Sequence, residues 1–92
     1  MSSRDVAAAS GKHDAIRAIY AAVDAPDWAA PNLDALIDVL RDLSWLPPGP
    51  VELRFAEPLP ATVAEALAIV ADETADTDRP VSVGRYPRDA LG

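Results

Sequence analysis

Carboxylates form the most regular arrangement of reactive groups in this sequence. Asp34, Asp38 and Asp42 are spaced four residues apart, so a helix places them in a row on one face. Like charges at this spacing destabilise a helix by about 0.2–0.5 kcal/mol per pair, and the helix dipole partly compensates only Asp34. Arg41 relieves the repulsion only if its side chain leans towards that face. The row is either an ordinary solvated face or a set of carboxylates that binds cationic groups.

A second group of acids lies late in the last predicted helix and just after it, at Asp72, Glu73, Asp76 and Asp78. No basic residue occurs between Arg54 and Arg79, and acids near a helix C-terminus oppose the helix dipole. Both groups thus contain acids where local stability does not favour them. If the fold brings the groups side by side, we expect a single negative patch on the surface.

Trp28 lies in a short loop directly before the acidic row, between Pro26 and Pro31, which stiffen the chain. An aromatic side chain on a rigid loop beside carboxylates is typical of a protein–protein interface anchor. The alternative is that Trp28 covers the edge of the core. Trp45 follows the apolar stripe that ends at Leu43, so we expect it in the core or at its edge.

Groups that could perform catalysis are scarce. His13 is the only histidine and lies beside a predicted helix start, where we expect an ordinary surface residue. There is no cysteine, which excludes disulfides, thiol nucleophiles and cysteine-based metal sites. The sequence has no glycine-rich phosphate loop, no metal-binding spacing and no G-x-S-x-G elbow. We therefore expect no enzyme activity, no catalytic residues, no metal and no cofactor.

The balance of charge favours a basic partner. Fifteen acids against eight Lys and Arg residues give a net charge of −7. This charge repels nucleic acid and anionic membranes and attracts basic proteins. The alternative is that the acidity only keeps the protein soluble. Arg greatly outnumbers Lys, as is common in bacteria with GC-rich genomes. The absence of cysteine, of a signal-peptide core and of an apolar run of roughly 18 residues favours the cytoplasm.

The elements that position these residues follow from hydrophobic periodicity. A helix from Asp14 has its apolar face at Ile16, Ile19, Tyr20 and Val23. Asn32 is a good N-cap for a second helix with an apolar stripe at Leu33, Leu36, Ile37, Leu40 and Leu43. Thr62 and Glu65 form a capping-box pattern for a third helix with an inner face at Val63, Ala66, Leu67 and Val70.

Strands are predicted near residues 5–9, 51–55 and 81–84, of which 51–55 alternates apolar and charged residues and should bury one face. The order is β-α-α-β-α-β, and the last β-α-β unit favours parallel pairing. We therefore predict an α/β fold with a small three-stranded parallel sheet packed with helices. Residues 1–92 should form one domain, with a tail at 87–92.

Residues 26–40 resemble the signature of the barstar family, an acidic–aromatic loop followed by a helix with two aspartates. Asn32-Leu33-Asp34-Ala35-Leu36 matches it outright, and the layout is similar over about residues 5–86. Ala30 stands where the family has a loop glycine, Pro31 where it has an acid and Ile37 where it has an aromatic residue. If the glycine position requires a positive φ, alanine is strained there.

The resemblance implies a barstar-like fold and a protein inhibitor of small, basic, secreted ribonucleases that prefer guanylyl sites. It implies a monomer that binds its target 1:1 and binds neither nucleic acid nor membrane. The partner-binding residues would be Trp28 and Ala30 in the loop, Asn32 at the helix start, Asp34, Asp38 and Asp42 on the helix, and the late acids Asp72, Glu73 and Asp76. Asp34 and Asp38 would enter the active site. The alternative is an acidic interaction module that binds another basic protein or toxin. A third class, an enzyme or small-ligand binder, would require a binding pocket.

Overall fold

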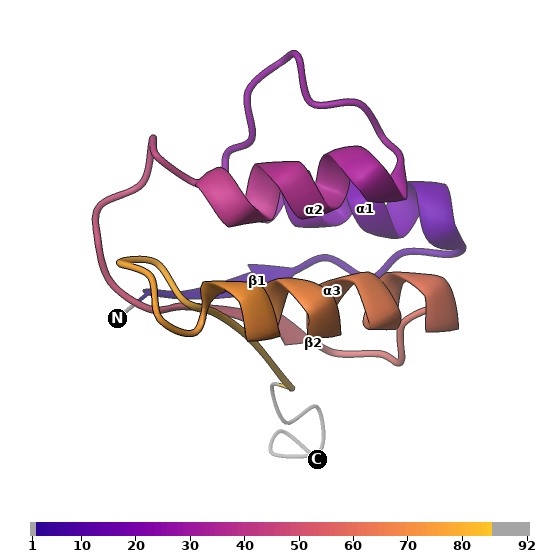
Figure 1. The fold of residues 1–92 in the computed structure, drawn as a ribbon. Coiled ribbons are helices and arrows are strands. Elements are labelled where there is room, and N and C mark those ends of the chain that lie inside the picture. Colours follow the sequence, from indigo (N-terminus) through magenta and orange to yellow (C-terminus); the bar gives the residue numbers. More distant parts are fainter. Residues whose placement is uncertain (1, 86–92) are drawn as a thin grey trace.

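The computed structural model describes residues 2–85, which form three strands and three helices in the predicted order β-α-α-β-α-β (Figure 1). The elements are β1 (Ser2–Val6), α1 (Lys12–Ala22), α2 (Leu33–Asp42), β2 (Val51–Phe55), α3 (Ala61–Thr74) and β3 (Val81–Arg85). The tail predicted at 87–92 lies outside the described residues.

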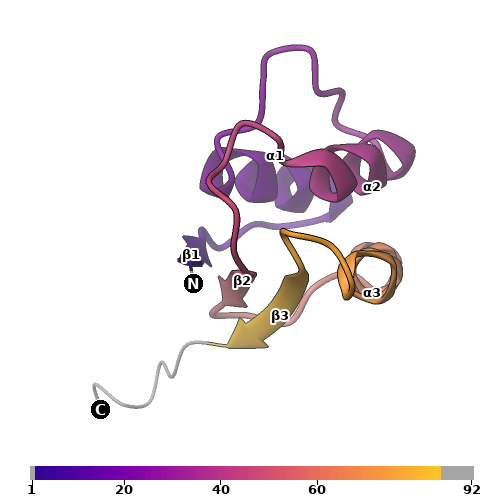
Figure 2. The same cartoon turned by 60° about the vertical axis from the view of Figure 1, so that its left-hand side comes forward.

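The three strands form one parallel sheet in the order β1-β2-β3, which confirms the predicted fold class. The helices cover one face of this sheet (Figure 2). Val51, Leu53 and Phe55 of β2 are buried on that face, as their alternation with charged residues predicts. The other face is polar: Ser3 Oγ donates to Glu52 Oε1 at 3.1 Å, and Arg54 Nε lies 3.5 Å from Asp5 Oδ1.

β1 begins and ends earlier than predicted, because it occupies Ser2–Val6 rather than residues 5–9. Its register pairs Ser2 with Val51 and Val6 with Phe55, so the strand ends where its partner ends. The three alanines after Val6 are apolar but belong to the connection to α1. The boundary is set by pairing with a distant strand, and local hydrophobicity does not encode it.

α1 begins at Lys12, two residues before the predicted start, because Gly11 turns the chain with a φ of 90°. α2 has the predicted N-cap, since the Asn32 side chain accepts a 2.8 Å hydrogen bond from the Ala35 amide. Leu43 is the C-cap of α2 and adopts the left-handed conformation with a φ of 43° while its side chain is fully buried. Burial of that side chain offsets the strain of the backbone.

α3 begins at Ala61, after Pro60, and no side chain caps it. The capping box predicted from Thr62 and Glu65 is therefore wrong, because Pro60 ends the preceding loop and both residues lie inside the helix. The inner face is as predicted, with Val63, Ala66, Leu67 and Val70 buried. The buried Thr74 hydroxyl donates to the Val70 carbonyl at 2.8 Å and accepts from the Val81 amide at 2.9 Å. It thereby joins the end of α3 to the start of β3.

Candidate protein-binding surface

The carboxylates of α2 point away from the core. Leu36, Val39 and Leu40 are buried against the rest of the protein, whereas Leu33 and Ile37 of the predicted stripe are only partly buried. Asp34, Asp38 and Asp42 are exposed on the opposite side of the helix. The Asp38 side chain is 76% exposed. The Asn32 cap fixes where the helix starts and so where its first carboxylate lies. The predicted row therefore exists as a solvent-facing line of acids.

Arg41 connects this row to the acids of α3. Its Nε lies 3.1 Å from Glu73 Oε1, and its Nη1 lies 3.9 Å from Asp38 Oδ1. α2 and α3 run side by side in both views (Figures 1 and 2), so the ion pair spans the junction between them. The expected proximity of the two acid groups thus holds for Asp38 and Glu73, whose carboxylates share one guanidinium.

The remaining late acids are exposed but are not tied to α2. Asp72 lies two positions after the buried Val70, which directs it outward from α3. Asp76 lies two residues after Thr74, the last residue of the helix, and is also exposed. Within residues 2–85, Glu73 is the late acid whose side chain pairs with α2. Residue spacing alone does not distinguish Glu73 from its acidic neighbours.

The loop before α2 presents Trp28 to solvent, since 67% of this residue is exposed. Trp28 therefore does not cover the core. Trp45 is half-buried instead, and its Nε1 donates to the Val23 carbonyl at 2.8 Å, at the point where α1 ends and the loop begins. The loop rises above α1 and α2 at the top of Figure 1. The loop that carries Trp28 directly precedes the acidic helix in the chain.

A tyrosine from α1 holds the far end of this loop. The Tyr20 hydroxyl donates to the Ala30 carbonyl at 2.6 Å, and the backbone N–H of Asn32 donates to the same oxygen at 2.9 Å. Tyr20 is 9% exposed, and burial raises the pKa of its hydroxyl above the usual value of 10.0. Residues with a positive φ other than glycine are Asp24 and Leu43 in the described chain. Ala30 therefore carries none of the strain that a substituted glycine could have caused.

Sequence patterns alone missed two features of this surface. Tyr20 was predicted as part of an apolar helix face, and its hydroxyl contact requires the loop to fold back onto α1. Ile69 is 46% exposed on α3, four residues before Glu73 and so on the same side of the helix. The four-residue spacing of Ile69 and Glu73 is visible in the sequence. It predicts an apolar side chain one helical turn from Glu73, beside the acids.

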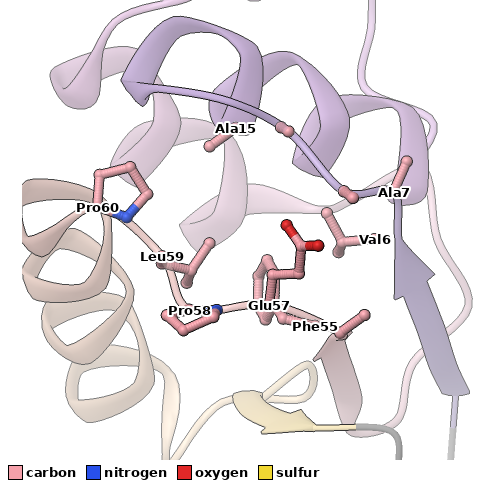
Figure 3. A pocket seen from close by; sticks show the side chains of 11 residues that line it. Val6, Ala7, Ala15, Phe55, Glu57, Pro58, Leu59 and Pro60 are labelled. Atoms are coloured by element: carbon pink, nitrogen blue, oxygen red, sulfur yellow. The ribbon is translucent and has the colours of Figure 1, made fainter. Parts of the chain in front are cut away.

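The carboxyl ends of β1 and β2 border a small pocket, the usual place for a ligand in an open parallel sheet. Its lining is mostly alanine, proline and other apolar side chains, with the Glu57 carboxylate directed into it (Figure 3). The cavity measures about 20 Å³, which accommodates roughly one water molecule. It is too small for a nucleotide or a comparable substrate.

Residues 2–85 contain no group of three or more His, Cys, Asp or Glu side chains placed to hold a metal ion. His13 is exposed, with Nδ1 4.0 Å from Asp14 Oδ1. None of the helices in the described chain is both long and apolar enough to cross a membrane. The exposed polar and aromatic groups described above are the carboxylates of α2 and α3 and the indole of Trp28 on the loop before α2.

Comparison with known proteins agrees with this arrangement. The model of one family, described as Barstar (barnase inhibitor), matches residues 3–84. No curated protein and no solved structure matches the chain significantly. The matched region includes the loop before α2, the acidic helix itself and all but one residue of each of β1 and β3. The chain therefore belongs to the barstar family, a family of ribonuclease inhibitors.

Proposed function

We propose that this protein inhibits a secreted, guanyl-preferring ribonuclease by covering its active site with α2 and the loop before it. The observation that carries the proposal is that an exposed aromatic loop leads directly into a helix with a solvent-facing row of carboxylates. Asp34 and Asp38 are solvent-facing on a helix whose start is capped, and the exposed Trp28 lies on a loop held at both ends. Membership of a family of barnase inhibitors supports the same function.

The mechanism follows from charge complementarity. A ribonuclease has to bind a phosphate, so its cleft gathers cationic side chains. Asp34 and Asp38 would occupy the positions of the phosphates, and an arginine can bind a carboxylate through two parallel hydrogen bonds. Attraction between an inhibitor with a net charge of −7 and a basic enzyme accelerates their association.

Trp28 would pack at the mouth of the ribonuclease's active-site cleft, and Ala30 and Asn32 would contact the edge of that cleft. Beside the loop lies a hollow lined by Arg17, Tyr20, Pro26, Asp27, Ala29 and Pro31. Its volume, about 320 Å³, suits a protruding side chain of the enzyme. The rim of acids formed by Asp42, Asp72, Glu73 and Asp76 would contribute peripheral contacts and long-range attraction.

In this proposal the protein acts in the bacterial cytoplasm as a one-domain monomer and binds its target 1:1. A cell that makes a ribonuclease for export is protected by such an inhibitor until the enzyme has left. Inhibition requires no catalytic residue, no metal and no cofactor, because the protein acts by occupying the cleft.

The test is a titration of RNA cleavage by barnase, the enzyme named in the family description. We expect cleavage of a guanylyl dinucleotide to fall linearly and to stop near one equivalent of the protein. RNase A, a ribonuclease with a different base preference, serves as the control and should retain its activity. Tight 1:1 binding to a basic protein without loss of cleavage would instead favour an interaction module for another basic protein or toxin.

A further inference from the structure

Arg41 is a cation inside a surface of carboxylates. Its guanidinium lies 3.1 Å from Glu73 and 3.9 Å from Asp38, at the junction of α2 and α3. Two other arginines have different partners: Arg4 donates a hydrogen bond to the Ala22 carbonyl, and Arg79 donates one to the Leu46 carbonyl. Arg41 forms ion pairs with two of the carboxylates proposed to bind the ribonuclease.

The side chain of Arg41 is accessible, because 52% of it is exposed. An exposed ion pair contributes about 0–1 kcal/mol, so a competing cation can displace this guanidinium from Glu73 at little cost. The positive charge nevertheless stays on α2, one turn after Ile37 and beside Asp38. A basic partner therefore meets a like charge at the centre of the surface that attracts it.

We propose that Arg41 is a specificity-determining residue that competes internally with the partner's cations for Glu73 and Asp38. The inference rests on the proposed function. Arg41 shields these two carboxylates in the free protein and lowers affinity for basic surfaces in general. Asp34, which lies two turns away on the same helix, remains outside its reach, so partners that engage Asp34 and the Trp28 loop as well overcome the competition. Such selection against unsuitable partners is a common route to specificity.

The test compares Arg41→Gln with Lys12→Gln. Both remove one positive charge, but Lys12 lies in the exposed first turn of α1, away from the α2–α3 junction. Binding to barnase and to a tetra-arginine peptide is measured by calorimetry at low ionic strength. We expect Arg41→Gln to tighten binding of the peptide, and of barnase, by about three- to tenfold more than Lys12→Gln does.

Glu73→Gln tests the competition itself. The loss of peptide affinity on Glu73→Gln should be larger in the Arg41→Gln protein than in the natural protein, because only there is Glu73 released from its internal partner. Equal gains for Arg41→Gln and Lys12→Gln would overturn the inference in favour of net charge. Weaker binding of Arg41→Gln would overturn it by making Arg41 itself a contact. Failure to inhibit barnase would contradict the proposed function, whereas the peptide measurement still decides the role of Arg41.

Discussion

The hydroxyl of Tyr20 donates a 2.6 Å hydrogen bond to the backbone carbonyl of Ala30, so α1 fixes the end of the loop that carries Trp28. The other end is held by Trp45, whose indole donates to the Val23 carbonyl. Both donors belong to elements outside the loop. The conformation of the loop that carries Trp28 therefore depends on the folded protein around it.

Removing the Tyr20 hydroxyl should loosen this loop. Tyr20→Phe keeps the buried ring but leaves the Ala30 carbonyl with one bond fewer, so we expect a loss of stability of about 1 kcal/mol in urea unfolding. Affinity for the ribonuclease should also fall, and the fall should be smaller in a Trp28→Ala background. An additive effect of the two substitutions would show that the hydroxyl does not act through Trp28.

The same hydroxyl makes stability depend on pH at the alkaline end. Burial raises the pKa of Tyr20 in the folded state, whereas the unfolded tyrosine ionises near pH 10. Stability from this group is therefore complete below about pH 10 and is lost as the pH rises through the folded pKa. As the pH rises above about 10, the natural protein should lose stability more steeply than Tyr20→Phe. Parallel curves for the two proteins would contradict this assignment.

Trp28→Ala should separate binding from stability. Trp28 is 67% exposed, so its removal should change the free energy of unfolding by less than about 0.5 kcal/mol. If Trp28 anchors the interface, the dissociation constant should rise by about 30-fold or more, equivalent to roughly 2 kcal/mol. Trp45→Phe is the control in which stability should change: loss of the hydrogen bond from its indole to the Val23 carbonyl should lower the free energy of unfolding.

Asp38→Ala should weaken ribonuclease binding by two or more orders of magnitude, because removal of one member of a desolvated charge pair costs about 2–5 kcal/mol. The free protein should be equally stable, since loss of the 3.9 Å contact with Arg41 is offset by less repulsion from Asp34 and Asp42. Asp14→Ala removes an exposed acid on α1 and should slow association only slightly. Equal losses of inhibition for the two variants would mean that net charge alone is responsible.

Thr74→Val should destabilise the protein although valine has nearly the same shape and is more apolar. The Thr74 hydroxyl accepts from the Val81 amide in a buried setting, and valine leaves that amide without a partner. We expect a loss of about 1–3 kcal/mol, measured by thermal or urea unfolding. Thr74→Ser retains the hydroxyl and should keep the larger part of the stability. Unchanged or increased stability of Thr74→Val would contradict the proposed link between α3 and β3.

Local patterns in the sequence determined the order of the elements, the buried faces of α1 and α3, part of the buried face of α2, the Asn32 cap and the row of acids on α2. Each depends on residues within a few positions of one another, because helix and strand periods fix which side chains share a face. The match of Asn32–Leu36 to a family motif likewise needs only contiguous residues.

Tertiary structure decided the features that join distant segments. β1 ends at Val6 because β2 sets its register, and α3 starts after Pro60 rather than at the capping pattern that follows. Trp28 and Trp45 are chemically identical, and only packing makes one exposed and the other a donor to Val23. The Arg41–Glu73 pair and the Tyr20–Ala30 bond also join separate elements. These relationships depend on distances through space between elements, which the spacing of residues along the chain does not specify.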